Sequence, residues 1–308
     1  MKRLVTLLLI VFATVSFAQY DRPGSTDAQF LNIGVSPRGA ALGDSYIALV
    51  EGAEGAHYNV ANIIRREGVD AAFNHTLWFA GINHDFASIS YNAGDVGAFA
   101  AHVTALYTDE MEVTTPLQPS GTGETFYAGY YRFGLAYSRW FTNLVSVGVG
   151  VSYIYGSLYQ DFTADAVAFN VAATYVGDFR GFRFGMQIAN FGSNLKYVYE
   201  GYPLPTTFTF GAAINALELE NQTVKALFKA NKPNDGAPLM SGGLEYDFQE
   251  TFFLRGGYNF NDQVADYSFG GGVNYSLGEY AVSANYSYNN YEILGGAHRF
   301  GMVFNLDL

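Results

Sequence analysis

The stretch LVSVGVGVSYIYG, Leu144–Gly156, alternates two kinds of residue with a period of two. The large apolar positions are Val145, Val147, Val149, Val151 and Tyr153, and the positions between them hold Ser146, Gly148, Gly150 and Ser152. A β-strand places successive side chains on opposite faces, so this segment is predicted to be a strand with one apolar face and one small, polar face. What lies against each face decides the class of fold.

Segments of this kind follow one another from Val69 to the C-terminus, separated by clusters of Gly, Asn, Asp or Pro. The connections between them alternate between short turns, such as AGDV and QET, and longer loops, such as Thr108–Thr125 and Phe191–Pro205. An even number of strands, joined by short turns at one end and long loops at the other, is typical of bacterial outer-membrane barrels. We therefore predict an all-β fold for residues 69–308, a transmembrane antiparallel β-barrel of about fourteen strands.

The polar face of the predicted strands favours a membrane barrel over a soluble barrel or sandwich. In Tyr280–Tyr288 the large residues alternate with Ala281, Ser283, Asn285 and Ser287. A soluble sheet would present Lys, Glu and Thr to water on this face, but only 14% of all residues are charged. We expect the apolar face to contact outer-membrane lipid, with Tyr and Trp near the strand ends, and the small face to line a filled or narrow lumen.

The N-terminal residues differ from the predicted barrel. Residues 1–18 have Lys2 and Arg3 followed by the apolar run Leu4–Val15 and a cleavage position after Ala18, which predicts a secretory signal peptide. No later run of about 20 apolar residues predicts a transmembrane helix. Residues 19–68 are rich in Ala and Gly without sustained alternation, and we predict that they fold into the lumen as a hatch or plug. Together these features predict export to the bacterial outer membrane.

Composition argues against several classes of function. A net charge of -12 offers no basic patch for nucleic acid, and the absence of Cys removes thiolate metal sites and Cys nucleophiles. No Gly-x-Ser-x-Gly motif is present, and the histidines lack metal-ligand spacing. These histidines are His57, His75, His84, His102 and His298. We therefore expect no enzyme activity and no cofactor.

The C-terminal strand carries a pattern that resembles the signal by which the barrel-assembly machinery recognises outer-membrane barrels. In RFGMVFNL a polar residue is followed by Gly and then by apolar residues at alternate places. The positions that carry this resemblance are Arg299, Gly301, Phe304 and Leu306. The chain ends in Leu308, where the usual signal has an aromatic residue.

The stretch FLNIGVSPRGAALGDSYIALVEGAEGAHYNVANI, Phe30–Ile63, resembles the N-terminal signature of the PorV/PorQ family, which is itself similar to FadL-type channels. It has a small-residue run and an aromatic-Asn-x-Ala motif, with Val60 where family members usually have Pro. The motif positions are Gly39, Gly43, Tyr58, Asn59 and Ala61. The stretches Ile188–Gly211 and Asp109–Phe126 also resemble the family, so the similarity extends from Phe30 to the C-terminus.

The resemblance implies a FadL-like barrel with the N-terminal segment in its lumen, and it leaves two hypotheses for function. In the first, the protein engages exported proteins or a surface-assembly apparatus, as family members do in type IX secretion. In the alternative, it is a FadL-like channel for small hydrophobic molecules that leave through a gap in the wall. Adjacent glycines permit bulging, so Gly270–Gly272 is the predicted place for a kinked strand in the second case.

Two loops and three arginines are further candidates. Carboxylates suit Ca²⁺, and the longest loop carries Asp109, Glu110, Glu112 and Glu124, although a solvated acidic loop is the simpler interpretation. The next long loop offers aromatic residues for a hydrophobic ligand or a protein strand, or for packing of the loop itself, namely Phe191, Tyr197, Tyr199 and Tyr202. Unpaired charges in the lumen are costly, so we expect acidic partners for Arg38, Arg65 and Arg66.

Overall fold

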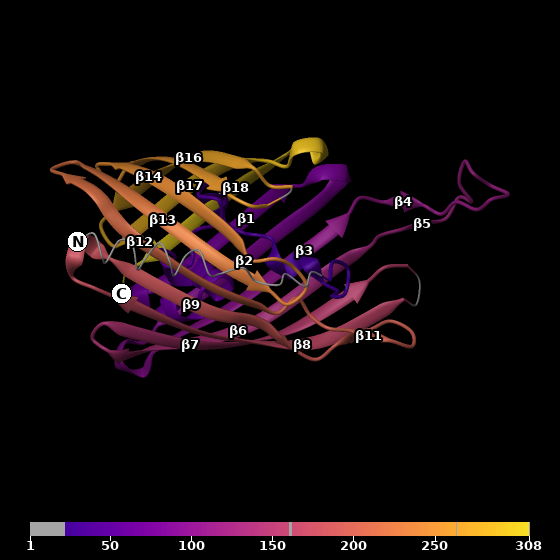
Figure 1. The fold of residues 1–308 in the computed structure, drawn as a ribbon, viewed down its shortest axis with the longest axis horizontal. Coiled ribbons are helices and arrows are strands. Elements are labelled where there is room, and N and C mark those ends of the chain that lie inside the picture. The colour runs from indigo at the N-terminus through magenta and orange to yellow at the C-terminus, as the bar shows by residue number, and fades with distance from the viewer. Residues whose placement is uncertain (1–21, 160–161, 263, 308) are drawn as a thin grey trace, which may run out of the picture.

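The computed structural model describes residues 22–159, 162–262 and 264–307, so the predicted signal peptide at residues 1–18 lies outside the described residues. Fourteen strands form a closed barrel in which β18 returns to pair with β1 (Figure 1). The barrel strands are β1 Val69–Leu77, β2 Ile82–Asn92, β3 Ala98–Thr108, β6 Gly129–Thr142, β7 Val145–Ser157, β8 Thr163–Val176, β9 Arg183–Gly192, β12 Thr207–Leu219, β13 Gln222–Pro233, β14 Leu239–Phe248, β15 Phe252–Asn259, β16 Tyr267–Leu277, β17 Tyr280–Asn290 and β18 Gly296–Leu306. The predicted all-β, fourteen-stranded antiparallel barrel is confirmed.

Strand β7, which contains the stretch that opened the sequence analysis, shows how the alternation is used. Its apolar side chains point outward, since Val149 is 52% exposed and Tyr153 is 45% exposed. Ser146 and Ser152 on the opposite face are buried inside the barrel. A Cβ atom on Gly148 would lie 2.4 Å from the carbonyl oxygen of Val60, so this position needs glycine for the close approach of the N-terminal residues.

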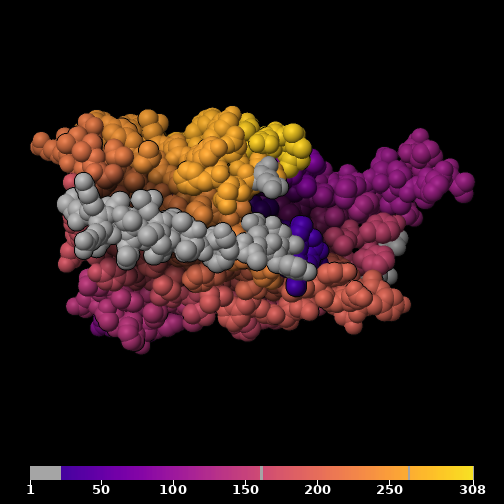
Figure 2. Space-filling view, viewed as in Figure 1, coloured from indigo at the N-terminus to yellow at the C-terminus, as the bar shows by residue number. Residues whose placement is uncertain are grey.

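The two ends of the barrel differ, as the loop lengths predict. Long connections hold two short hairpins, β4 Met111–Glu112 with β5 Thr125–Phe126, and β10 Leu195–Lys196 with β11 Gly201–Tyr202. We call the end of the barrel that carries these hairpins the loop end, and the opposite end the turn end. Figures 1 and 2 show the β4–β5 hairpin projecting well beyond the other loops. Short 3₁₀ turns make other connections: η4 Phe79–Gly81, η5 Gly94–Val96, η6 Phe179–Gly181 and η7 Glu292–Leu294.

The N-terminal segment, residues 22–68, consists of short helical turns packed against the inward-facing side chains of the barrel (Figure 1). Its elements are η1 Gln29–Asn32, α2 Pro37–Ala41, η2 Gly52–Glu54, α3 Gly55–Tyr58 and η3 Val60–Arg65. Helix α2 contacts β16 and β17, and η3 contacts β6, β7 and β8. None of the helices in the described part of the chain is long and apolar enough to cross a membrane.

The kink predicted at Gly270–Gly272 is wrong. Strand β16 pairs with both neighbours in continuous register through these glycines. The glycines serve close packing instead, since a Cβ atom on Gly270 would lie 2.8 Å from Ala41 Cβ of α2. A Cβ atom on Gly272 would lie 2.3 Å from Asn285 Oδ1. The small residues therefore make room inside the barrel without disturbing the strand.

Candidate functional site

A cavity of about 460 Å³ lies between the N-terminal segment and the strand ends at the loop end of the barrel. Its floor is made by segment residues that include Ile33, Ile47 and Tyr58, and its upper part by Trp78 and Tyr291. The walls mix polar and apolar surface, because the inward face of β12 to β14 and β17 carries hydroxyl and amide side chains there beside apolar ones such as Leu239. We take this cavity as the candidate site.

Lys229 of β13 is the central charged group of the cavity wall. In register with it are Gly211 on β12 and Ser241 on β14, which also face inward. Two residues further along, Asn231 is paired with Thr209, and both line the same cavity. Within the described residues, no hydrogen bond or ion pair is formed by the Lys229 ammonium, and the charges acting on it come from Asp44 and Asp262.

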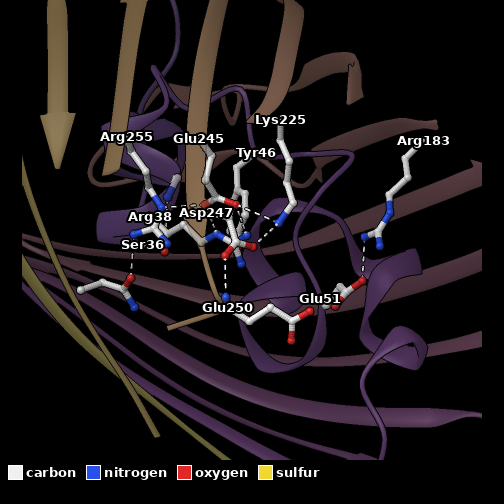
Figure 3. Close-up of polar contacts among 12 residues, drawn as sticks. Ser36, Arg38, Tyr46, Glu51, Arg183, Lys225, Glu245, Asp247, Glu250 and Arg255 are labelled. Atoms are coloured by element: carbon white, nitrogen blue, oxygen red, sulfur yellow. Dashed lines mark hydrogen bonds and ion pairs between the residues drawn. The ribbon is translucent and has the colours of Figure 1, made fainter. Parts of the chain in front are cut away.

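A buried ionic cluster lies nearer the turn end and joins the N-terminal segment to the wall (Figure 3). Glu245 of β14 is fully buried and receives a bidentate ion pair from Arg38 of α2, with N–O distances of 2.8 and 2.7 Å. Arg255 of β15 donates to the same carboxylate at 2.7 Å, and Lys225 of β13 at 3.3 Å. One carboxylate thus contacts three cations, Asp247 adds a second carboxylate 3.4 Å from Lys225, and Arg38 anchors the segment through charge-assisted hydrogen bonds.

The arginines near the segment have the acidic partners expected from the sequence. Besides the Arg38 pair, Arg65 lies 3.9 Å from a Glu51 oxygen and Arg66 lies 3.8 Å from an Asp70 oxygen. Arg183 of β9 also binds Glu51, at 2.6 Å. Burial and the charge of Arg183 lower the pKa of Arg65 to about 10.

The predicted hatch-motif residues hold the segment in its conformation. A Cβ atom on Gly39 would lie 2.7 Å from the hydroxyl oxygen of Tyr58, which accepts a hydrogen bond from the Ser36 backbone N–H. Gly43 has a φ of +64°, in the left-handed region, and its N–H donates to Ser268 Oγ of β16. The motif is therefore a packing motif, in which the small residues admit the tyrosine and the strand.

Asn59 and Ala61 form the beginning of η3 and connect it to the wall. The Asn59 side chain accepts from the Ala61 N–H and donates to the Ile47 carbonyl and to Thr174 Oγ1 of β8. Between them, the N–H of Val60 donates to Gln187 Oε1 of β9 at 3.1 Å. A proline has no N–H, so Val60 in place of the usual proline supplies this bond between segment and wall.

Burial also shifts the pKa of Glu54 and of His57 in the segment. The carboxyl of Glu54 accepts a hydrogen bond from Asn74, but burial still raises its pKa above the ordinary value of 4.5. Burial lowers the pKa of His57 well below its ordinary value of 6.5, and the positive charge of Arg132 acts in the same direction. His57 is therefore neutral at pH 7 inside the barrel.

The wall beside the cavity is irregular between β8 and β9. Phe169 pairs with Phe191 but Val171 pairs with Ile188, so β9 has one extra residue in a β-bulge. Asn190 adopts a left-handed conformation there with φ of +59°, and its N–H donates to Asn170 Oδ1. A groove of about 450 Å³ lies over the outer face of this region, and its lining includes Val147, Val149, Val171, Met186, Ile188 and Phe208.

Gln187 stands between this groove and the cavity and lines both of them. Its side chain accepts from Val60 and donates to the His57 carbonyl at 3.4 Å. Gln187 thus binds the segment and forms part of the wall between the cavity and the outer groove.

Of the four loop residues predicted as a binding surface, three are exposed and one packs inward. Tyr199 is 88% exposed, and Phe191 and Tyr202 are also exposed. Tyr197 instead packs against a buried cluster that contains Ile154 and Leu195. The predicted surface therefore reduces to three exposed aromatic residues, and its role stays a prediction.

The acidic residues predicted for Ca²⁺ lie along the β4–β5 hairpin. Glu110 accepts a hydrogen bond from Thr125 at 2.6 Å, and Asp109 lies at the base of the hairpin near Asn83. Across residues 22–307 as described, no three His, Cys, Asp or Glu side chains gather into a possible metal site. The carboxylates Asp109, Glu110, Glu112 and Glu124 therefore do not form a preorganised cation site, and this prediction has no geometric support.

The residues of the predicted insertion signal lie in β18. Phe304 points outward and is 47% exposed, whereas Arg299 is fully buried and donates to Asn289 Oδ1 at 2.5 Å and to Tyr291 Oη. A Cβ atom on Gly301 would collide with Asn74 Oδ1 and Pro37. Arg299 and Gly301 thus have roles in the folded barrel, and recognition by assembly machinery stays a prediction.

Sequence reasoning missed Lys229 and the cluster around Glu245. A signal was present, since Lys225, Lys229, Glu245 and Arg255 are charged residues at positions that the period of two places on the inward face of their strands. The pattern gives the face of each charge, but not which charges meet across the lumen.

Solved structures of other proteins share this fold. No protein-family model matches the sequence, and no curated protein does. Among solved structures, the Pseudomonas putida toluene transporter TodX aligns with a TM-score of 0.63 at 12% identity, covering 89% of this chain and 98% of that one. The Ralstonia pickettii toluene transporter TbuX gives a TM-score of 0.60 at 14% identity, covering 89% and 99%. The chain has a FadL-like barrel fold.

A Pseudomonas aeruginosa FadL homologue aligns with a TM-score of 0.51 at 12% identity, covering 88% of this chain and 97% of that one. At such identities the likeness establishes a shared fold, while the chemistry of the site has to come from the residues of this chain.

Proposed function

We propose that this protein is an outer-membrane channel that takes up small molecules. The observation that carries the proposal is the cavity of about 460 Å³ between the N-terminal segment and the loop end. A space of this size suits a small ligand. The FadL-like fold, shared with the toluene transporters TodX and TbuX, supports the same class of function.

Placement in the outer membrane is supported by the outward face of the barrel. Large apolar side chains such as Phe73, Phe133, Leu254 and Phe269 are each more than half exposed. An apolar face of this extent on a soluble protein would drive association, whereas in a bilayer it contacts lipid. The predicted signal peptide at residues 1–18 supplies the export that this placement requires.

We infer that the N-terminal segment acts as a plug. The cavity floor is made by this segment, and below it the Arg38–Glu245 ion pair and the Asn59 hydrogen bonds tie it to the wall. A solute that enters from the loop end therefore has two ways out. A polar solute needs the segment to move, whereas an apolar solute suits the bulged wall near Gln187, where the outer groove is apolar.

Engagement of exported proteins is the second candidate function, and it rests on the PorV/PorQ resemblance and on the exposed loops. The β4–β5 hairpin projects from the loop end (Figure 2), and the side chain of Tyr199 is 88% exposed. Such features suit a docking surface, but they do not require a cavity inside the barrel.

Affinity purification from detergent-solubilised outer membranes distinguishes the two candidates. A tag between Thr115 and Gly121, at the tip of the β4–β5 loop, leaves the barrel and the segment untouched. Mass spectrometry for proteins and small molecules should recover the barrel alone with a bound small molecule. Stoichiometric recovery of an exported protein, with no small molecule, would favour the docking function and overturn the channel.

A further inference from the structure

The lining of the cavity combines apolar surface with polar groups that a hydrocarbon would leave without partners. Its inward wall carries Thr209, Lys229, Asn231 and Ser241 on neighbouring strands, with Asn259 and Asn290 further round. A hydrocarbon in this space would strip water from amides, hydroxyls and an ammonium without replacing their hydrogen bonds. The ligand that fits must bring donors and acceptors of its own.

The cavity carries a cationic side chain and carboxylates that act on it. Lys229 is the cationic group, and in the described residues its ammonium has no hydrogen bond or ion pair. The carboxylates of Asp44 and Asp262 act on it from the segment and from the β15–β16 loop. Asp262 Oδ1 accepts the N–H groups of Val264 and Ala265, and Asp44 accepts only a bond of 3.3 Å from Tyr58.

Aromatic side chains line the same space. Trp78 and Tyr291 pack against each other at the loop end with ring centroids 5.0 Å apart, and Tyr58 and Tyr267 also line the cavity. They offer flat apolar surface beside the polar wall. A purely anionic solute would meet three carboxylates, those of Asp44, Asp235 and Asp262, but only one cation in this lining, Lys229. His57 adds no positive charge, because it is neutral.

We propose that the cavity binds a small zwitterionic solute, an α-amino acid or a short peptide, with its carboxylate on Lys229, its ammonium toward Asp44 and Asp262, and its side chain against the aromatic residues. The amide groups of Asn231 and Asn290 match the remaining donors and acceptors of a peptide-like ligand. This inference rests on the proposed small-molecule channel and names its substrate class.

Four probes that share a phenyl ring separate the contributions. Phenylalanine has both charges, hydrocinnamate only the carboxylate, phenethylamine only the ammonium, and ethylbenzene neither. Binding is read from the fluorescence of Trp78, which lines the cavity, in purified full-length protein that carries Trp140→Phe to remove the other tryptophan. Uptake of the same probes into proteoliposomes is measured in parallel.

Phenylalanine should bind most tightly, and Lys229→Met should weaken phenylalanine and hydrocinnamate by at least about tenfold while leaving phenethylamine unchanged. Lys232→Met on the same strand is the matched control, since Lys232 donates to the Gly236 carbonyl and does not line the cavity. Asp44→Asn keeps an acceptor for Tyr58 and tolerates the left-handed backbone of this residue, and it should weaken the two ammonium-bearing probes.

Binding of phenylalanine that Lys229→Met leaves unchanged would overturn the zwitterion assignment. Ethylbenzene bound or taken up as well as phenylalanine would also overturn it, but would leave the small-molecule channel standing. Failure of all four probes to bind and to enter proteoliposomes would count against both.

Discussion

At the scale of single residues, glycines permit the close contacts by which the N-terminal segment packs. Gly148 leaves room for the Val60 carbonyl, as Gly39 does for Tyr58. Gly148→Val should therefore push η3 away from β7 while the strand itself keeps its pairing, because its outward neighbours are unchanged. Amide hydrogen exchange at residues 60–65 should speed up in this variant, with Gly256→Val as a control at a glycine whose Cβ would meet nothing closer than 4.0 Å.

Unchanged protection of residues 60–65 in Gly148→Val would contradict this packing role.

Glu245 is the residue on which the ionic cluster depends. Glu245→Gln leaves Arg38 and Arg255 inside the barrel without their shared counter-charge, while Lys225 keeps only Asp247. Breaking one partner of a buried ion pair costs about 3–5 kcal/mol, so the free energy of unfolding should fall by roughly that amount. Urea unfolding in lipid measures it, and Glu250→Gln, at an exposed carboxylate on the neighbouring turn, should change it little. Equal effects of the two substitutions would argue against the cluster.

His57 should make docking of the segment dependent on pH. Burial holds its pKa well below 6.5, so the displaced segment binds a proton more readily than the docked segment does. This contribution to docking is complete above pH 6.5 and is lost as the pH falls below that value. Glu54 acts in the opposite direction, because its raised pKa favours the docked state at low pH.

Amide exchange of residues 52–65, compared at pH 7.5 and pH 5, measures the His57 contribution when wild type is set against His57→Phe. The phenylalanine keeps a ring against Tyr58 and Phe86 but cannot be protonated. The wild type should lose more protection on acidification than the variant. Identical pH dependence in both would exclude His57 as a source.

At the scale of elements, the strands could be predicted from the sequence, but the register and the packing contacts between them could not. A period of two with turn clusters gives a strand, its inward face and its length, which is why β7 and β17 were found from the sequence. The bulge at Asn190 depends on how β8 and β9 register against each other, and no local pattern encodes that. The glycines of β16 were misinterpreted for the same reason, since whether glycine marks a bulge or a close contact depends on what packs against it.

The β4–β5 hairpin is an element that the barrel should not need. It pairs with itself, at Met111↔Phe126 and Glu112↔Thr125, and its tip is exposed. Replacing residues 113–123 by a short Gly-Ser linker should change the free energy of unfolding by no more than about 0.5 kcal/mol. Urea unfolding in lipid, with and without Ca²⁺, checks this. A larger loss, or a Ca²⁺-dependent gain in the intact protein, would restore a structural or metal-binding role to the loop.

At the scale of the whole molecule, sequence periodicity predicted a barrel and composition predicted a segment inside it, because a long Ala- and Gly-rich stretch without strands must bury its apolar residues somewhere. The charge arrangement of the candidate site could not be predicted, since Asp44, Lys229 and Asp262 reach one cavity from distant parts of the chain. The fold places a cavity above a segment that is docked inside the barrel. The central claim is that solutes pass when this segment moves.

A reversible cross-link tests that claim most directly. The hydroxyl oxygens of Ser45 in the segment and Ser241 in β14 lie 2.9 Å apart, and the chain has no native cysteine. Ser45→Cys with Ser241→Cys should form a disulfide that holds the segment against the wall. Uptake of phenylalanine into proteoliposomes should stop when the pair is oxidised and return on reduction, whereas oxidant and reductant should not change uptake by either single-cysteine protein. Equal uptake in the oxidised and reduced protein would contradict passage through the segment.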